Sequence, residues 1–329
     1  MKKVWKNIGI LAVILILVLL IGAIVYNLQI VETVISEEKE YYAPEYNSEY
    51  ITVNTIELEN SEISNEYQFV FIADLQASII DENEEDEEDE QIRTSLEDRR
   101  NHFLALNENG TTPELIFNEI INYTNNKNAD ALLLVGDILD SPSNSNINFL
   151  KSNLANLQTD YLYTFGNHDW TFLWDYQTDE TWQTYSPKFS EFMDDTEVSY
   201  LEYEDLIVLA INDGREQIEE SAIEKIKEVL EKGKPTLVML HIPIATEYIV
   251  EQTLEIRDEV YAIGGEYGIE ANEYTEEAIN LILSDEYNVF YIIAGHTHFE
   301  VQDTVNGITE YVTAPAYDGT VNLIKINSN

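Results

Sequence analysis

The chain contains no cysteine and few basic residues, and both shortages restrict what it can do. Without cysteine it forms no disulfide and no thiolate metal site, so any transition metal must bind through nitrogen and oxygen ligands. Only 17 Lys and Arg residues stand against 63 acidic ones, which gives a formal net charge of -46. Such a negative field repels nucleic acid, which is therefore not an expected partner. The 44% hydrophobic content of the 329 residues is enough for a sizeable core.

Charged residues are also absent from residues 8–26, an apolar run near the N-terminus. A helix of this length spans roughly 28 Å, close to the ~30 Å hydrocarbon core of a bilayer. Lys2, Lys3 and Lys6 precede the run and mainly acidic residues follow it, so the positive-inside bias places the N-terminus in the cytoplasm. We therefore predict a cytoplasmic tip and transmembrane signal anchor over residues 1–30, with the rest of the chain outside the cell membrane. A cleaved signal peptide is the alternative.

The rest of the chain divides into a polar spacer, residues 31–49, and one domain, residues 50–329. Alternating hydrophobicity over residues 50–58 predicts a first strand. Short apolar runs, typical of strands buried on both faces, follow at residues 67–73, 131–135, 161–165, 236–240 and 289–294. Between them, helical spacing predicts helices over 113–125, with Thr112 as N-cap, and over 217–232. Strands and helices therefore alternate, as in α/β folds.

Two segments do not fit this alternation. Residues 81–91 form an acidic insertion, in which nine of the first ten residues are acidic. So dense a block predicts a solvated, mobile segment. Calcium binding is the alternative, although no EF-hand spacing is present. Residues 244–280, with Gly264-Gly265 and several tyrosines, are interpreted either as part of the wall of a site or as ordinary surface structure.

Polar residues follow each apolar run at the point where the predicted strand ends. They are Asp74, Gly136-Asp137, Gly166-Asn167-His168, His241 and Gly295-His296-Thr297-His298. The carboxyl ends of strands in α/β sheets are where ligands gather, so these side chains can converge although they are far apart in sequence. Four of the five histidines lie at these ends. The fifth, His102, is interpreted as a structural residue.

Together these motifs resemble the calcineurin-like metallophosphoesterase superfamily, whose pattern runs D-x-H, G-D-x-x-D, G-N-H-D/E, H and G-H-x-H. Here the pattern reads Asp74-Leu75-Gln76, Gly136-Asp137-Ile138-Leu139-Asp140, Gly166-Asn167-His168-Asp169, His241 and Gly295-His296-Thr297-His298. One motif alone would be weak, but five in order are specific. The resemblance runs from about residue 50 to the end and is closest to membrane-tethered bacterial members. It implies a four-layer α/β/β/α sandwich of two mixed sheets that hydrolyses phosphate mono- or diesters.

The resemblance also implies a role for each residue around two divalent metal ions, manganese, iron or zinc. Asp137 would bridge both metals, since a carboxylate can hold two cations about 3.5–4 Å apart. Asp74, Gln76 and His298 would complete one site, and Asn167, His241 and His296 the other. A hydroxide shared by the metals would be the nucleophile. His168 would protonate the leaving group, oriented by Asp140, with Asp169 as supporting residue. A turn residue is the alternative reading of Asp140.

Gln76 departs from the family pattern, which usually has histidine there. An amide oxygen is a weaker and harder donor than imidazole, so the first metal site is expected to bind less tightly or to prefer manganese or iron. Two hypotheses follow. The first is an extracytoplasmic phosphoesterase for a small or lipid-linked phosphoester. The second is a catalytically weak or inactive module that binds metal or a partner on the same fold.

Overall fold

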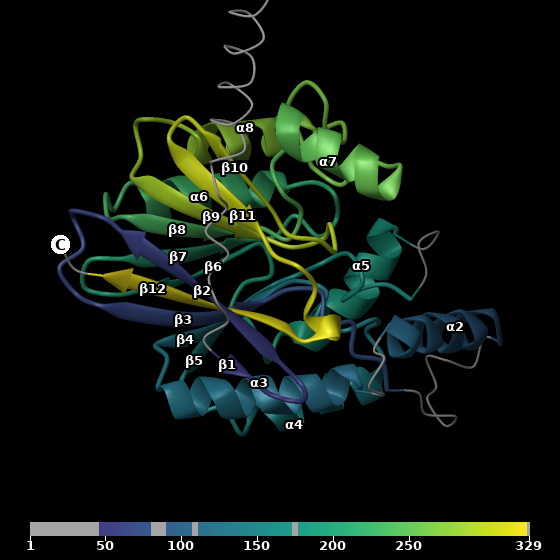
Figure 1. Cartoon of the computed structure of the whole chain (residues 1–329). Coiled ribbons are helices and arrows are strands. Elements are labelled where there is room, and N and C mark those ends of the chain that lie inside the picture. Colours follow the sequence, from purple (N-terminus) through teal and green to yellow (C-terminus); the bar gives the residue numbers. More distant parts are fainter. Residues whose placement is uncertain (1–45, 80–89, 107–110, 173–176, 328–329) are drawn as a thin grey trace, which may run out of the picture. The chain divides into compact units, whose positions relative to one another are not determined.

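Two mixed β-sheets form the centre of the structure (Figure 1). The computed structural model describes residues 46–79, 90–106, 111–172 and 177–327. One sheet has the order β1-β2-β12-β3-β4-β5, with strands Tyr46–Asn47, Thr52–Glu59, Thr320–Asn327, Tyr67–Ile72, Ala131–Val135 and Asp160–Thr164. The other has the order β10-β11-β9-β8-β7-β6, with strands Val301–Val305, Ile308–Val312, Val289–Ala294, Thr236–Met239, Ile207–Ile211 and Val198–Glu202.

Parallel neighbours lie at the middle of both sheets. Strands β3, β4 and β5 run parallel in the first sheet, and β7, β8 and β9 run parallel in the second. Their carboxyl ends therefore meet at common edges, as the strand-end motifs predict. The last strand, β12, lies between β2 and β3, parallel to the first and antiparallel to the second.

The core has three apolar layers because strands such as β4 are buried on both faces. Leu132 and Leu134 pack with the helices α3 (Pro113–Lys127) and α4 (Asn144–Leu154). Leu133 and Val135 point the other way, into the layer between the two sheets. On the second sheet, α6 (Glu220–Leu230) and α8 (Glu273–Ile282) cover the outer face (Figure 1). The predicted four-layer α/β/β/α sandwich is therefore confirmed.

The two predicted helices form, with shifted boundaries: α3 extends to Lys127 and α6 ends at Leu230. Leu115 N donates to the side chain of Thr112, which caps α3 as predicted. Helix α6 begins at Glu220 rather than at residue 217. The side chain of Gln217 accepts a hydrogen bond from Asn272 N, and Ile218 N donates to Thr275 Oγ1. These contacts hold the entry to α6 as a loop against the N-terminal end of α8.

Several elements were not predicted from the sequence. They include the helices α2 (Glu90–Leu106), α5 (Asp179–Tyr185) and α7 (Glu247–Arg257). They also include the 3-10 helices η3 (Ser186–Phe189) and η4 (Ala316–Asp318). Helix α2 begins at the last residue of the acidic block, while residues 80–89 lie outside the described residues. Strand β1 lies within the segment interpreted as a spacer.

The predicted membrane span, residues 8–26, lies outside the described residues. Within the described residues, no helix has both the length and the apolar character needed to cross a membrane.

A buried carboxyl on β11 predicts a measurable pH dependence of stability. Glu310 is buried and accepts a hydrogen bond from Ile244 N at 2.9 Å. Burial raises the pKa of Glu310 from 4.5 to about 8, so the folded chain holds a proton that the unfolded chain has lost. The contribution of this bound proton to the free energy of unfolding is fully present below the unfolded pKa of Glu310 and is lost as pH rises through the folded pKa. At about 1.4 kcal/mol per pKa unit, it weakens the fold by roughly 2 kcal/mol between about pH 5.5 and 7.5.

The Glu310→Gln variant should therefore lose less stability over this pH range than the wild type, since its amide cannot titrate. Urea unfolding of the metal-free protein at both pH values measures the difference. Glu228→Gln, which removes an exposed carboxyl from α6, is the control and should follow the wild type. Identical pH slopes for wild type and Glu310→Gln would show that this carboxyl is ionised in the fold.

Candidate active site

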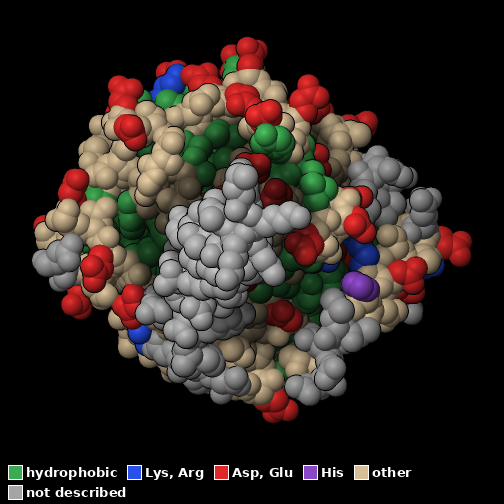
Figure 2. All heavy atoms as spheres, turned by 45° about the horizontal axis from the view of Figure 1, so that its top comes forward, with side chains coloured by type: hydrophobic (Ala, Val, Ile, Leu, Met, Phe, Trp, Pro, Cys, Tyr) green, Lys and Arg blue, Asp and Glu red, His purple; other side chains and the backbone are tan. Residues whose placement is uncertain are grey.

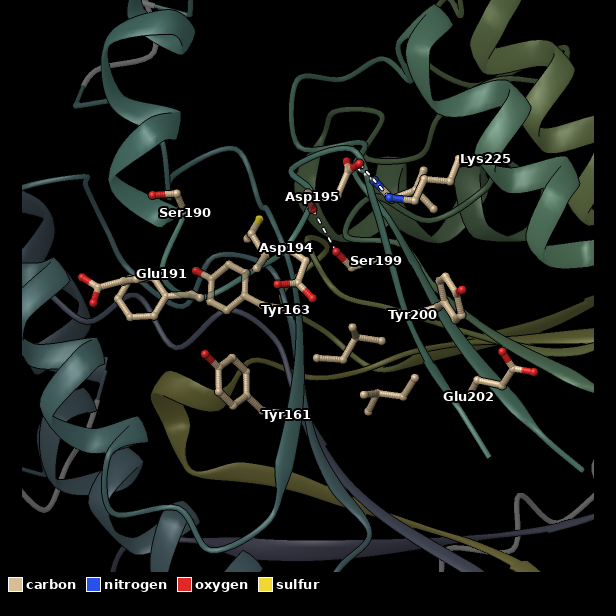
Figure 3. A pocket seen from close by; sticks show the side chains of 15 residues that line it. Tyr161, Tyr163, Ser190, Glu191, Asp194, Asp195, Ser199, Tyr200, Glu202 and Lys225 are labelled. Atoms are coloured by element: carbon tan, nitrogen blue, oxygen red, sulfur yellow. Dashed lines mark hydrogen bonds and ion pairs between the residues drawn. The ribbon is translucent and has the colours of Figure 1, made fainter. Parts of the chain in front are cut away.

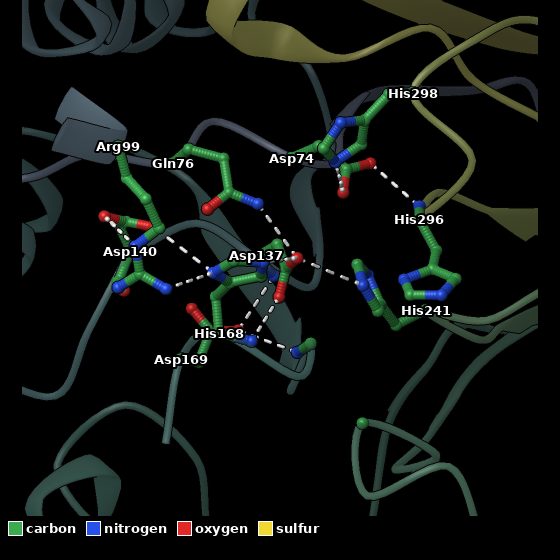
Figure 4. Close-up of polar contacts among 12 residues, drawn as sticks. Asp74, Gln76, Arg99, Asp137, Asp140, His168, Asp169, His241, His296 and His298 are labelled. Atoms are coloured by element: carbon green, nitrogen blue, oxygen red, sulfur yellow. Dashed lines mark hydrogen bonds and ion pairs between the residues drawn. The ribbon is translucent and has the colours of Figure 1, made fainter. Parts of the chain in front are cut away.

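Six of the seven predicted metal ligands converge at the ends of the parallel strands of both sheets (Figure 4): Asp74, Gln76, Asp137, His241, His296 and His298. Two groups of possible ligand atoms form, each with its atoms within 4.8 Å of one another. One group is Asp137, His241 and His296, and the other is Asp74, Asp137 and His298. Asp137 thus belongs to both groups, as a bridging carboxylate must. This is the arrangement that the sequence predicted, although the ligand role of each residue remains a prediction.

Short contacts connect these side chains. Asp137 Oδ2 lies 3.4 Å from His241 Nε2 and accepts a hydrogen bond of 2.9 Å from Gln76 Nε2. Asp74 Oδ1 lies 3.2 Å from His298 Nε2. His241 Nδ1 lies 2.9 Å from Val135 O, a partner that can only accept, so Nδ1 carries a proton and Nε2, which faces Asp137, is the ring nitrogen that can bind a cation.

The backbone is strained at five of these positions. Asp74, Gln76, Asp137, His296 and His298 have φ between 52° and 68°, whereas only nine non-glycine residues in the described part of the chain have positive φ. This conformation costs about 1 kcal/mol or more per residue and persists only where the surroundings impose it. The strained backbone at the strand ends therefore indicates that the orientation of these side chains is imposed by the surrounding structure at a cost in backbone energy.

Gly166 shows how closely the strand ends approach. A Cβ atom at this position would overlap with the carboxylate and the backbone nitrogen of Asp137. Only glycine lets the end of β5 pass so near the end of β4. The G-N-H motif thus needs its glycine for the approach of Asp137 and not for a turn.

Two buried carboxylates behind the ligands hold these loops in place. Asp169 accepts a hydrogen bond from Tyr163 Oη. It also accepts hydrogen bonds from the backbone N–H groups of Asp137, Leu139 and Gly166. Its supporting role agrees with the prediction. Asp213 accepts from His241 N and Ile242 N, at 2.8 and 2.9 Å. Asp213 was not predicted from the sequence, although the apolar run of β7 ends two residues before it and gives the same signal as the other strand ends.

The electrostatic potential at the site is strongly negative. Burial opposes a proton on His241, yet the carboxylates of Asp137, Asp74 and Asp213 outweigh it and raise the pKa of His241 to about 10. Burial also raises the pKa of Asp213 to about 7. Burial and the neighbouring His241 hold the pKa of His296 well below 6.5, which keeps that ring neutral and able to ligate. A potential that retains a proton on His241 would equally favour a cation.

The donor set fits a pair of divalent cations. The side-chain oxygens of Gln76 and Asn167 are buried and find no hydrogen-bond donor in the described part of the chain. Unpaired buried oxygens are costly unless another partner, such as a cation, meets them. Carboxylate, amide oxygen and imidazole are ligands that suit manganese, iron and zinc. Gln76 reaches Asp137 through its nitrogen, so a half-turn of the amide would present its oxygen to a cation held there.

His168 and Asp140 lie beside the ligand groups and form the predicted pair. His168 Nδ1 is 3.2 Å from Asp140 Oδ1, and its Nε2 is 3.8 Å from Asp137 Oδ2. The backbone N–H of His168 donates to Asp137 Oδ1 at 2.8 Å. Asp140 is fully buried and turned toward His168, which favours the orienting role over that of a simple turn residue. His102, by contrast, belongs to neither ligand group; it is exposed on α2, with its ring 5.6 Å from that of Phe103.

Two segments outside the motifs also reach the site. Arg99 on α2 touches both Asp140 and His168 (Figure 4), and no pattern in the sequence singled it out. In the segment 244–280, Arg257 Nε donates to Thr297 O at 3.1 Å, and the ring of Tyr261 lies 5.2 Å from that of His296. Part of this segment is therefore a wall of the site.

A cavity of about 730 Å³ lies elsewhere, between the edge strands β5 and β6 (Figure 3). Tyr161, Tyr163, Asp194 and Tyr200 contribute to its lining, but none of the predicted metal ligands does. Its volume alone would make it a binding-site candidate. The strand ends are the better candidate because the titratable and strained groups gather there.

Comparison with known proteins identifies the class to which this architecture belongs. Residues 67–300 match the family model described as calcineurin-like phosphoesterase. The chain therefore belongs to the calcineurin-like phosphoesterase family. Members depend on a dinuclear metal centre, and the chain is accordingly a hydrolase acting on phosphoric ester bonds.

Solved structures with a similar fold include three phosphoric ester hydrolases of low sequence identity. A dimetal phosphatase from Danio rerio has 12% identity and a TM-score of 0.48, over 77% of this chain and 88% of that one. A purple acid phosphatase from yellow lupin (Lupinus luteus) seeds has 13% identity and a TM-score of 0.46, over 79% and 45%. The phosphopantetheinyl hydrolase of Mycobacterium tuberculosis has 9% identity and a TM-score of 0.40, over 78% and 92%. No curated protein matches the chain.

Replacement of Gln76 tests its predicted ligand role. If its amide oxygen binds a cation, Gln76→Ala should lower the affinity for one of two Mn²⁺ ions by about 10- to 100-fold, the effect typical of lost coordination support. Gln76→His, which restores the usual family residue, should bind both ions at least as tightly as the wild type. Isothermal titration calorimetry measures both. Unchanged stoichiometry and affinity in Gln76→Ala would mean that Gln76 is not a ligand.

Proposed function

We propose that this chain hydrolyses a small or lipid-linked phosphate mono- or diester at the outer surface of the cell membrane with the help of two divalent cations. The observation that carries the proposal is the presence of Asp137 in both ligand groups. Family membership supports phosphoester hydrolysis. The membrane location rests on the apolar run of residues 8–26 and its basic flank.

Each cation would have its own set of residues. Asp74, Gln76, Asp137 and His298 would hold one cation, and Asn167, His241 and His296, with Asp137 again, the other. Manganese, iron and zinc all suit these donors. When bound, such a pair activates water near neutral pH, by lowering its pKa from about 15.7 toward 7, and offsets the charge of the phosphoryl group.

His168 would supply the proton that the leaving group needs. When the bond from phosphorus to the leaving oxygen breaks, that oxygen keeps the electron pair and needs a proton to depart as an alcohol. His168 Nε2 faces the ligand groups, while Asp140 Oδ1, 3.2 Å from Nδ1, fixes the plane of the ring. Donation from Nε2 leaves a neutral imidazole, which water reprotonates for the next cycle.

The charge of the chain supports a small or lipid-linked substrate over a polyanion. Acidic side chains are spread across the face shown in Figure 2, with few basic ones among them. A formal charge of -46 opposes the approach of a long anion such as nucleic acid. A single phosphoester presents little charge outside the site itself.

One observation favours the second candidate, a metal- or partner-binding module with weak or absent turnover. Gln76 donates its amide nitrogen to Asp137 and keeps its oxygen turned away from that carboxylate. A weakly held cation at that position would slow turnover without abolishing binding. The positions of His168 and Asp140 oppose this candidate, since a pure binding site needs no proton donor.

Replacement of His168 separates the two candidates. In the full chain with Mn²⁺, His168→Ala should lower kcat for a phenyl phosphate mono- or diester by about 10²- to 10⁴-fold, the usual range for lost general acid catalysis. Its Mn²⁺ content should not change, because His168 belongs to neither ligand group. Steady-state kinetics and metal analysis measure the two quantities.

The matched control is His102→Ala, which removes the exposed histidine of α2 and should keep wild-type activity. If the wild type takes up Mn²⁺ but turns over neither ester, the binding module is the correct function. If His168→Ala is as active as His102→Ala, His168 is not the proton donor.

The membrane location is tested on cells that express the full chain. An anchored chain should stay in the membrane fraction after alkaline carbonate extraction, keep residues 1–30, and be digested by protease added outside intact cells. Mass spectrometry of the N-terminus checks the second point. A released chain that begins after the apolar run would identify a cleaved signal peptide instead.

A further inference from the structure

We infer that Arg99, on the inserted helix α2, is a positioning residue for the proton donor His168. The inference rests on the proposed function, in which His168 protonates the leaving group. Its observations are the contacts of one guanidinium group with the two loops that carry Asp140 and His168. None of the strand-end motifs contains this arginine.

The guanidinium of Arg99 joins the loop after β4 to the loop after β5. Its Nη2 donates to the backbone carbonyls of Asp140 and Phe172, both at 3.0 Å. These carbonyls come from the loops that carry the two members of the Asp140–His168 pair. Because a guanidinium is planar and its donors are fixed in a fork, it sets the separation of the loops as well as linking them.

The same guanidinium also touches the pair itself. Arg99 Nε lies 3.4 Å from Asp140 Oδ2, and Nη1 lies 3.4 Å from His168 Nδ1. Asp140 has no side-chain exposure, so its charge must be met by protein groups. His168 faces one carboxylate oxygen and Arg99 the other. These contacts of the carboxylate are ion-pair contacts and not hydrogen bonds, and through them the charge of Arg99 favours the carboxylate orientation that directs Oδ1 at Nδ1.

Arg99 is placed by the packing of α2 on both sides of it. Leu96, one turn earlier, is buried with Phe172, the residue whose carbonyl Arg99 binds. The ring of Phe103, one turn later, lies 4.9 Å from that of Tyr317, which itself lies 5.4 Å from His298. Since two carbonyls and a carboxylate already surround the guanidinium, its role is to hold the pair.

Kinetics with two leaving groups test the inference in the full chain with Mn²⁺. Arg99→Gln should lower kcat for a phenyl ester by about 10- to 100-fold, part of the loss expected for His168→Ala. It should change kcat for a 2,4-dinitrophenyl ester little, because that leaving group departs without a proton. KM should stay the same for both. The double variant Arg99→Gln, His168→Ala should be no slower than His168→Ala alone.

Two further variants keep the test decisive. Arg100→Ala is the matched control, because it removes a neighbouring arginine of α2 that pairs with Glu114 and not with Asp140. It should keep wild-type kinetics. Arg99→Lys keeps the charge but not the fork, so it should lie between wild type and Arg99→Gln, and it replaces Arg99→Gln if that variant does not fold.

A spectroscopic reading without metal separates position from activity. With only five histidines in the chain, the imidazole nitrogen signals of His168 can be assigned by NMR of the metal-free protein. Replacement of Arg99 should shift or broaden the Nδ1 signal of His168, whereas Arg100→Ala should not. An unchanged signal would overturn the inference.

The outcomes distinguish the inference from the proposed function. If the loss of kcat in His168→Ala depends on the leaving group and the loss in Arg99→Gln does not, the inferred role of Arg99 is wrong and the proposed function stands. Equal losses for both esters, a rise in KM alone, or losses that add to those of His168→Ala would also overturn it. If His168→Ala itself shows no dependence, the proposed proton transfer fails.

Discussion

Asp137 is held at both of its carboxylate oxygens. Oδ1 accepts the backbone N–H of His168, and Oδ2 faces Gln76 and His241. Because the group is buried, protein partners or cations and not water must meet its charge. The ends of β3, β4, β5 and β8 are therefore tied to one carboxylate. The spacing of the proton donor from both ligand groups follows from this contact.

Hydrogen bonds from backbone N–H groups to buried carboxylates, more than side-chain packing, fix the positions of the predicted ligands. Asp169 and Asp213 accept N–H groups from the loops that carry Asp137 and His241, and Asp74 Oδ2 accepts His296 N at 2.9 Å. Such contacts fix the left-handed backbone at the strand ends, where a free chain would relax. The core on both sides of each sheet supplies the stability against which this strain is held. The ligands are thus placed before any cation arrives.

The sequence predicted those parts of the fold in which local pattern and tertiary position agree. The bounds of β4 and β9 match the structure because fully apolar runs end directly at a glycine. The last strand, β12, was missed because Asn322 and Lys325 interrupt its apolar residues. The site residues were found because each follows a strand. Arg99 was not, since it lies on a mostly polar helix and acts only through tertiary contact.

The acidic surface and a cation-dependent site are compatible, because they act over different distances. Two divalent cations, once bound, would outweigh the charge of the two carboxylates, Asp74 and Asp137, that would hold them, and would so reverse the potential at the strand ends. Screening limits this reversal to about 8 Å at physiological ionic strength. A phosphoester in the site would then be attracted by the cations, whereas the distant parts of a polyanion would be repelled by the surrounding Asp and Glu residues. Under the proposed function, the surface charge would thereby act as a filter on substrate size, set by the same carboxylates that make the chain acidic.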